Sequence, residues 1–474
     1  MMVHPFRGVP LLWEGRKEML FTNRDLYKIA IPLMLQSILA TTIGMIDSVM
    51  VAGIGEAAVS GVALINSLDA VLVNFFAAMV AGGTVIISQY LGKGDMQKSQ
   101  EAMKQLLYVT LAVSLLITLF GQIFREPMLR LLFGEVEEGV MYYADRYFLF
   151  VSLSFPFLGL ANACSAAMRA MGNSATPMLI SLVDNGCNIL LNGVFIYWLD
   201  METAGAAIAS LISRVIGAGI LLLLMMDRRQ DIHIDRPLYY RPEFSIIRGI
   251  LRIGIPNAIE NCMFSFGKLL TQSVVSTLGT ASITANSVAS NVVNYQYIAG
   301  ASVGNASVIV IGRCIGAGEK EQAKHYSRKL LFAAYLCVWT VVLITAVLVR
   351  PIIGCWQLTP ETTELTRDLI LFHCVSAALV WPVGFVLPSM FRAASDVKFP
   401  MVISITCMWL FRVAFSYILA PESYPVLGMN LPGLGMGVMG VWVAMIIDWA
   451  VRVAIYAWRY FSGRWLTVYD KIKE

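Results

Sequence analysis

Long apolar stretches alternate with short polar connectors along the whole chain. A helix needs about 20 apolar residues to cross the roughly 30 Å hydrocarbon core of a bilayer. Stretches of this kind lie at about 29–53, 59–88, 104–124, 143–168, 176–199, 204–226, 250–278, 282–312, 330–349, 366–390, 398–420 and 435–460. The composition agrees, because 58% of the residues are hydrophobic and 14% are charged, against about 25% charged in soluble proteins. The pattern therefore predicts an all-α polytopic membrane protein with 12 transmembrane helices.

The two halves of the chain repeat each other. Residues 91–107 resemble residues 315–331 at an offset of 224 positions, and Pro32 and Pro256 keep the same offset. Each repeat holds six apolar stretches, and an even number inserts both halves in the same orientation. We expect two six-helix bundles related by a pseudo-two-fold axis along the membrane normal, an arrangement that transporters use for alternating access.

Charge in the connectors predicts the orientation. Connectors after the even-numbered stretches hold most of the lysines and arginines, whereas acidic residues populate the odd-numbered connectors. By the positive-inside rule both termini are cytoplasmic, and the short termini fit a prokaryotic plasma (inner) membrane. The expected organisation is an N-terminal cytoplasmic segment 1–28, a lobe 29–226, a cytoplasmic linker 227–249, a lobe 250–461 and a cytoplasmic tail 462–474.

Other functional classes lack their motifs here. The eight cysteines and four histidines are scattered, with no CxxC pair, so the sequence predicts neither a disulfide framework nor a metal cluster. A GxxxxGK[ST] loop and a nucleophile elbow are both missing from the sequence. We therefore expect no enzyme, no cofactor and no nucleic-acid partner. The expected partners are small organic molecules and membrane lipids, and the expected state is a monomer.

One carboxylate, Asp47, interrupts the first apolar stretch. A charge at this depth costs at least about 2.5 kcal/mol to insert, so it must face protein, water or an ion. Two interpretations follow. Asp47 is either a hydrogen-bonded structural acid or an ion or proton site that other helices surround.

Three polar residues of the fifth stretch are spaced by four and share one helix face: Asp184, Asn188 and Asn192. With Asp47 they offer the oxygen ligands that a hard cation prefers. The alternative is hydrogen bonding between helices, at about 1–2 kcal/mol per bond. Asp184, nearer the cytoplasmic start of the helix, is a candidate relay or helix cap. Asp69 in the second stretch either lines a cavity or forms a structural pair.

The second half has its own intramembrane charges. Glu260 and Lys268 are eight residues apart on one face of the seventh helix, and Arg412 lies in the eleventh. We expect Glu260 to pair with Lys268 or Arg412, and the alternative is a substrate or proton site that opens when such a pair breaks. Asp448 and Arg452 have the spacing of an intrahelical pair. The candidates for substrate contact in the eighth helix are Tyr295, Gln296 and Tyr297, through stacking and cation–π contacts.

Several motifs carry a family likeness. They are a proline-led first helix with an acid (Pro32, Asp47), paired G-x-G loops after helices two and eight, RAMGNSATP before helix five and NILLNGVFIYW within it. The sequence resembles the multidrug and toxic compound extrusion (MATE) family of the MOP flippase superfamily. The resemblance implies a V-shaped pair of lobes that exports organic, often cationic compounds against Na⁺ or H⁺.

The resemblance also implies a coupling site. The family's cation-binding positions in the N-terminal lobe fall on Asp47, Asn188, Asn192 and Ser210, and Asp47, Asn188 and Asn192 would be the ligands of a Na⁺ ion. Asn192 matches the NorM-like branch, whereas the DinF-like branch has an aspartate there. Glu260 lies four residues from an acid of NorM-like relatives, and no carboxylate occupies residues 371–390.

These observations predict a secondary active multidrug exporter that works by alternating access. The alternative is a lipid-linked oligosaccharide flippase of the same superfamily, which would need a strongly cationic central cavity. Intramembrane acids are about as frequent as bases here, which favours a cationic cargo.

Overall fold

The computed structural model describes residues 19–134, 137–235, 241–426 and 429–473, and the side chains of residues 43–49, 52, 56, 424–426, 429–431 and 471–473 lie outside this description. The elements, in chain order, are α1 Asn23–Ala52, α2 Glu56–Gly92, α3 Met96–Ile123, α4 Arg125–Phe133, α5 Glu138–Leu153, α6 Phe155–Ala170, α7 Ala175–Asn192, the π-helix η1 Gly193–Trp198, α8 Glu202–Met225, α9 Phe244–Ser276, α10 Thr280–Gly316, α11 Lys320–Val347, α12 Val349–Gly354, α13 Pro360–Ala393, α14 Lys398–Cys407, the π-helix η2 Met408–Val413, α15 Ala414–Leu419, the strands β1 Ser423–Val426 and β2 Met429–Pro432, α16 Gly437–Phe461, the 3₁₀-helix η3 Arg464–Thr467 and α17 Val468–Lys473.

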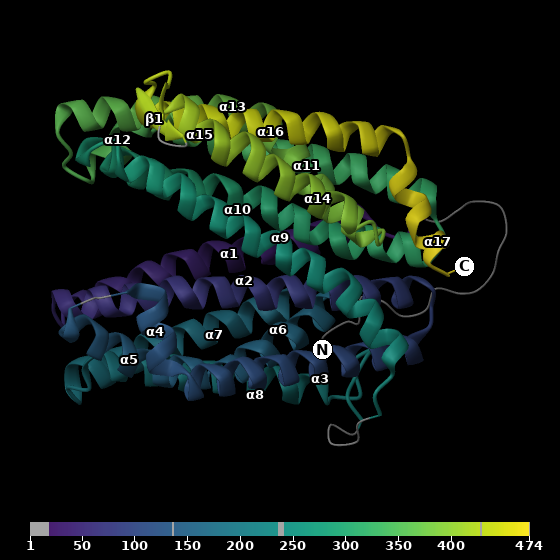
Figure 1. The fold of residues 1–474 in the computed structure, drawn as a ribbon. Coiled ribbons are helices and arrows are strands. Elements are labelled where there is room, and N and C mark those ends of the chain that lie inside the picture. The colour runs from purple at the N-terminus through teal and green to yellow at the C-terminus, as the bar shows by residue number, and fades with distance from the viewer. Residues whose placement is uncertain (1–18, 135–136, 236–240, 427–428, 474) are drawn as a thin grey trace.

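Helical segments occupy all twelve stretches that the sequence predicts. Within the described residues, nine helical segments and the pair α5–α6, bent by 43°, are long and apolar enough to cross a membrane. The 30 residues of α1 and the 33 residues of α9 complete the set. Figure 1 shows α2–α8 grouped on one side of the molecule and α10–α16 on the other. The all-α fold of two six-helix bundles is confirmed.

The internal repeat extends to helix lengths and turns. Helices α2 and α10 each have 37 residues, α3 and α11 each have 28, and each pair begins 224 residues apart. The turns that follow α2 and α10 use Gly94 at φ 74° and Gly318 at φ 79°. A side chain is strained at these angles, so glycine lets both helices end in the same tight turn.

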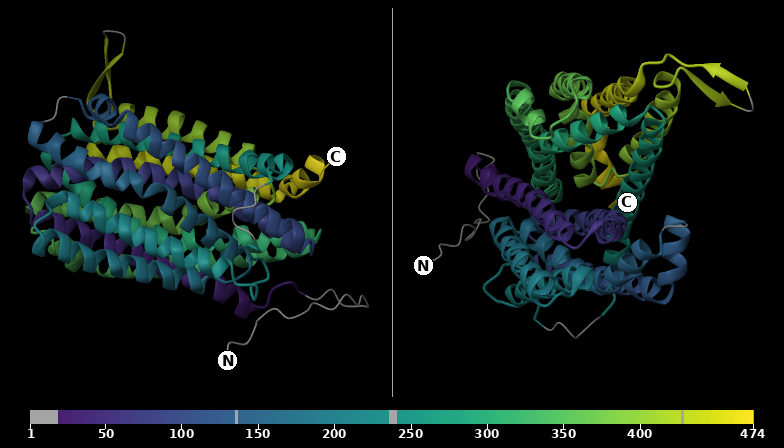
Figure 2. Two further views of the ribbon diagram at one scale, coloured as in Figure 1. Left: turned by 90° about the horizontal axis from the view of Figure 1, so that it is seen from below. Right: turned by 90° about the vertical axis from the view of Figure 1, so that its left-hand side faces the viewer.

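A short hairpin was not expected from the sequence. Strands β1 and β2 pair antiparallel between α15 and α16, and they project away from the helices in Figure 2. Pro421, Pro425 and Pro432 fall in this segment, and proline lacks the N–H group that a helix interior requires.

The first helix connects the two lobes. Its N-terminus is capped by Thr22 and Asp25 in a capping box, and the hydroxyl of Tyr326 in α11 donates to the carbonyl of Phe21 at 2.7 Å. Leu26 and Ile29 pack into the hydrophobic core of the C-terminal lobe, while the helix as a whole also contacts α7. Figure 2 shows α1 between the two groups of helices.

The lobes also meet where α2 crosses α9 and α10. The side-chain amide of Gln89 donates to the carbonyl of Ala393 at 2.9 Å, and Arg313 donates to the carbonyl of Ala170 at 3.1 Å. A Cβ at Gly316 would collide with the carbonyl oxygen of Gln89. This close crossing lies at the end that the charge pattern predicts to be cytoplasmic.

Candidate functional site

A chain of hydrogen bonds joins three of the predicted coupling residues in the N-terminal lobe. Asn192 donates to the side-chain oxygen of Asn188 at 3.1 Å, and Asn188 donates to the hydroxyl of Ser210 in α8 at 3.1 Å. Both asparagines are buried, with 7% of the surface of Asn188 and 2% of the surface of Asn192 exposed. The spacing of four thus aligns the amides on one face of α7, and Asn188 contacts α8 through Ser210.

The helix changes form directly after this chain. Asn192 is the last α-helical residue of α7, and η1 begins at Gly193. π-helical turns are rare and frequently occur at functional sites. Helix α1, which carries Asp47, packs along α7 and touches α8. The side chain of Asp47 lies outside the described part of the chain, so its role as the fourth member stays a prediction.

Asp184 lies apart from the hydrogen-bonded chain. It lines a cavity of about 150 Å³ together with Arg214, Arg169 and Gln36. Its Oδ1 atom is buried and has no hydrogen-bond partner among the described residues. The sequence placed Asp184 on the same face as Asn188, but in the fold it faces a basic cavity one turn away.

Asp69 forms an ion pair with Arg214, which agrees with the structural one of the two interpretations of Asp69. Arg214 of α8 donates to its Oδ2 at 3.1 Å and to the hydroxyl of Ser154 at 2.7 Å. The two charged side chains are 17% and 19% exposed. Sequence reasoning missed Arg214, although a lone arginine inside the sixth apolar stretch was a usable signal.

Glu260 forms an ion pair, but the prediction of Lys268 or Arg412 as its partner was wrong. Arg392 of α13 donates to Glu260 Oε2 at 3.1 Å, and both side chains are largely buried. Lys268 is two helical turns along α9, about 12 Å away at 1.5 Å per residue. Arg392, on another helix, therefore reaches Glu260, whereas Lys268 on the same helix lies too far along the axis.

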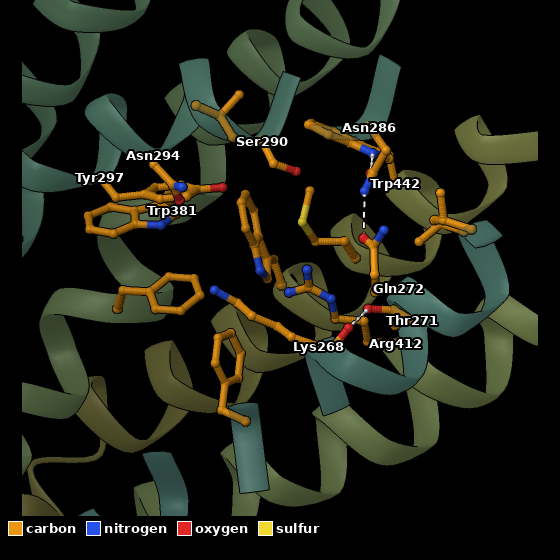
Figure 3. Close-up of a pocket in the computed structure, with 17 residues that line it drawn as sticks. Lys268, Thr271, Gln272, Asn286, Ser290, Asn294, Tyr297, Trp381, Arg412 and Trp442 are labelled. Carbon is orange, nitrogen blue, oxygen red and sulfur yellow. Dashed lines mark hydrogen bonds between the residues drawn. The ribbon is translucent and has the colours of Figure 1, made fainter. Parts of the chain in front are cut away.

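A cavity of about 330 Å³ with several aromatic residues in its lining lies inside the C-terminal lobe (Figure 3). Its walls come from α9, α10, α13, η2 and α16. Lys268 and Arg412 line it together with Tyr297. Figure 3 shows Lys268 and Arg412 side by side below Ser290 and Asn294.

Of the three predicted substrate-contact residues, one lines the cavity and another holds it in position. Tyr297 lines the cavity, whereas the described lining includes neither Tyr295 nor Gln296. The oxygen of Gln296 lies 2.9 Å from Nδ1 of His373, and Nε2 of His373 lies 2.6 Å from the hydroxyl of Tyr297. An acceptor at Nδ1 places the proton there, so Nε2 accepts from the tyrosine. Gln296 therefore holds Tyr297 in place through His373.

Carboxylates and imidazoles do not form a metal cluster in the described residues, where no group of three His, Cys, Asp or Glu side chains is placed to hold an ion. An ion at the predicted site would depend on amide and hydroxyl oxygens together with Asp47. Such all-oxygen sets suit hard cations.

The model of one transporter family, MatE, matches residues 32–194 and 256–418. The chain belongs to the MatE family. The two matched segments begin 224 residues apart and coincide with the two repeats, so each lobe is one MatE unit. Together they cover most of the chain.

Several curated relatives of this MatE protein have multidrug-resistance names. It is 25% identical over 408 residues to the "Probable multidrug resistance protein NorM" of Thermotoga maritima, covering 84% of this chain and 85% of that protein. It is 24% identical over 405 residues to the "Probable multidrug resistance protein YoeA" of Bacillus subtilis, covering 84% and 87%. A solved structure with a TM-score of 0.83 and 18% identity is described as the outward-facing conformation of a multidrug resistance MATE family transporter of the MOP superfamily. That match covers 94% of this chain and 96% of the other, and it shows the shared two-bundle fold.

Proposed function

We propose that this MatE protein is a secondary active exporter of small organic compounds that exchanges its substrate for Na⁺ or H⁺. The observation that carries the proposal is the hydrogen-bonded chain Asn192–Asn188–Ser210 beside the helix of Asp47. Buried polar groups inside a membrane bundle are costly and mark ion pathways. The multidrug-resistance names of relatives that match most of their length support export of organic compounds.

Coupling follows from a difference in affinity between two states. The cation binds Asp47 with the oxygens of Asn188, Asn192 and Ser210, and substrate binds better when this site is empty. Because each ligand favours an opposite conformation, the inward movement of one drives the outward movement of the other. Asn192 cannot take a proton, so proton coupling at these positions would depend on Asp47 alone.

We also propose a membrane, an orientation and an oligomeric state for the protein. The relatives named above are bacterial, and we place the chain in a prokaryotic plasma (inner) membrane with both termini in the cytoplasm. The lobes contact each other through Gln89 and Arg313 at the end that we assign to the cytoplasm. One chain contains both lobes, so we propose that the monomer is active and that it requires no cofactor beyond the coupling ion.

The decisive experiment is efflux from proteoliposomes under a Na⁺ gradient or a H⁺ gradient imposed separately. We expect one gradient to drive export of a fluorescent organic compound, and Asp47→Asn to abolish it because the amide cannot hold the cation's charge. The matched control is Asp227→Asn, the same change in an exposed connector. Export at the wild-type rate by the Asp47 variant, with normal yield and folding, would refute the coupling role.

A further inference from the structure

Positive charge without an acidic partner distinguishes the C-terminal cavity. Lys268 and Arg412 are the charged side chains in its described lining. Among the described residues neither has an acid within ion-pair distance, and the buried Nε of Arg412 has no hydrogen-bond partner. Asp448 is near enough to interact with Arg412, but Asp448 forms its ion pair with Arg452. Charged side chains inside a membrane bundle are costly and mark substrate or ion pathways, and here the excess charge is positive.

The acids near this cavity are already neutralised. Glu260 pairs with Arg392 at 3.1 Å, and Asp448 pairs with Arg452 at 2.8 Å. The expectation of a cationic cargo depended on the number of intramembrane acids. Since these acids have arginine partners, that number overstates the negative charge that a substrate would meet.

Flat aromatic side chains form another part of the cavity lining. The rings of Tyr297 and Trp381 stack with centroids 5.4 Å apart and planes inclined by 16°. Trp381 stacks on Phe385 at 5.1 Å and 14°. Because Trp381 already stacks on both neighbours, a ligand ring would pack against the edges or the outer faces of this stack. An aromatic pair in such a geometry is worth about 0.5–1.5 kcal/mol beyond burial. The hydroxyl of Tyr297 is held by His373, so its position in the wall is defined.

The aromatic ring nearest to the two charges already makes cation–π contacts with the protein's own side chains. The Nζ of Lys268 lies 5.2 Å from the ring centroid of Phe264, and the guanidinium of Arg412 lies 5.7 Å from the same ring. A substrate cation would compete with both groups for this ring and be repelled by them. An anionic group would instead be attracted by both.

We propose that this cavity binds an aromatic organic anion, with its negative group at Lys268 and Arg412 and its ring against Tyr297, Trp381 and Phe385. The inference rests on the proposed exporter function and names its substrate class. A volume of about 330 Å³ lies at the small end of the roughly 300–1,000 Å³ typical of ligand pockets. It suits one or two fused rings and excludes the bulk of a lipid-linked oligosaccharide.

Binding and transport are tested separately. The binding probes are 2-naphthoate and 2-naphthylmethylammonium, which share a ring system and differ in charge. Binding to the purified full-length protein is followed by quenching of tryptophan fluorescence, because Trp381, Trp442 and Trp449 line the cavity. We expect the carboxylate to bind at least about tenfold more tightly than the ammonium compound, as for one charge-assisted hydrogen bond.

Variants locate the site. Lys268→Gln and Arg412→Gln should each weaken naphthoate binding about tenfold, and Lys268→Arg should retain it. The control Lys398→Gln removes an exposed positive charge of the same lobe and should leave binding unchanged. Thermal unfolding in detergent identifies any variant that fails to fold. If a glutamine variant does, naphthoate binding is compared between Lys268→Arg and Lys268→Met instead.

Four results would overturn the proposal: tighter binding of the ammonium compound, equal binding of both probes, naphthoate binding that Lys268→Gln and Arg412→Gln leave intact, or tighter binding of geranyl diphosphate. The last would favour a lipid-linked cargo. Transport distinguishes the two proposals. Naphthoate that binds but is exported under neither gradient contradicts the exporter function, whereas gradient-driven export of other compounds without naphthoate binding contradicts only this cavity assignment.

Discussion

Asp448 and Arg452 of α16 illustrate how single residues keep a charge inside a helix bundle. Their side chains are 0% and 3% exposed, and two hydrogen bonds of 2.8 Å and 3.1 Å join them. The spacing of four residues on one helix brings the two groups together, so this pair was predictable from sequence. Removing one member of a buried pair costs about 3–5 kcal/mol, because the other charge remains in an apolar environment.

We therefore expect Asp448→Asn to lower the free energy of unfolding by about 3 kcal/mol. The double variant Asp448→Leu/Arg452→Met removes both charges and should lose much less. Unfolding of purified protein in detergent by a denaturing surfactant measures both. A double variant as unstable as the single one would show that packing, and not the isolated charge, determines the loss.

At the scale of elements, α2 of one lobe packs against α9 and α10 of the other through close backbone contacts. A Cβ at Gly82 of α2 would lie 2.5 Å from the carbonyl oxygen of Ile250 in α9. At the crossing of α2 and α10, both Gly92 and Gly316 face backbone carbonyls that cannot move aside as a side chain would. Small residues at such crossings let membrane helices approach each other closely.

The substitution Gly316→Ala should weaken this crossing and reduce the transport rate, because the methyl group would collide with the carbonyl of Gln89. The control is Gly219→Ala in α8, where a Cβ would meet open space. Alanine is favoured over glycine in a helix interior by up to about 1 kcal/mol, so the control should be as stable as the parent or more stable. Thermal unfolding and proteoliposome export measure the two effects. Equal behaviour of the two variants would contradict a tight crossing.

At the scale of the whole molecule, two MatE units form one transporter whose lobes must move relative to each other. The amide of Gln89 in one lobe lies 3.0 Å from the hydroxyl of Ser395 in the other. This contact belongs to the end that we assign to the cytoplasm. Alternating access requires it to break in every cycle.

A cross-link across this contact should stop export. We expect cysteines at positions 89 and 395, joined by a short bifunctional thiol reagent, to abolish transport, and reduction of a cleavable reagent to restore it. Each single-cysteine variant treated in the same way controls for the chain's own cysteines, of which Cys355 is exposed. Full export by the cross-linked protein would show that the lobes need not separate at this end.

Several features could be predicted from sequence because their causes are local. The cost of placing polar groups in a bilayer marks the apolar stretches, and the spacing of four aligns Asn188 with Asn192 on one face of α7 whatever surrounds it. The repeat is visible as an offset between similar segments. It reappears in the equal lengths of α2 and α10.

Contacts between helices depended on the tertiary structure, because they require the rotation and axial position of each helix. Glu260 pairs with Arg392, which is 132 residues away, and not with Lys268 on its own helix. Asp69 likewise meets Arg214 across the N-terminal lobe. Helix packing also decided which residues form the cavity of Lys268 and Arg412, since its walls come from five separate elements. No spacing along the chain records that arrangement, because only packing brings those elements together.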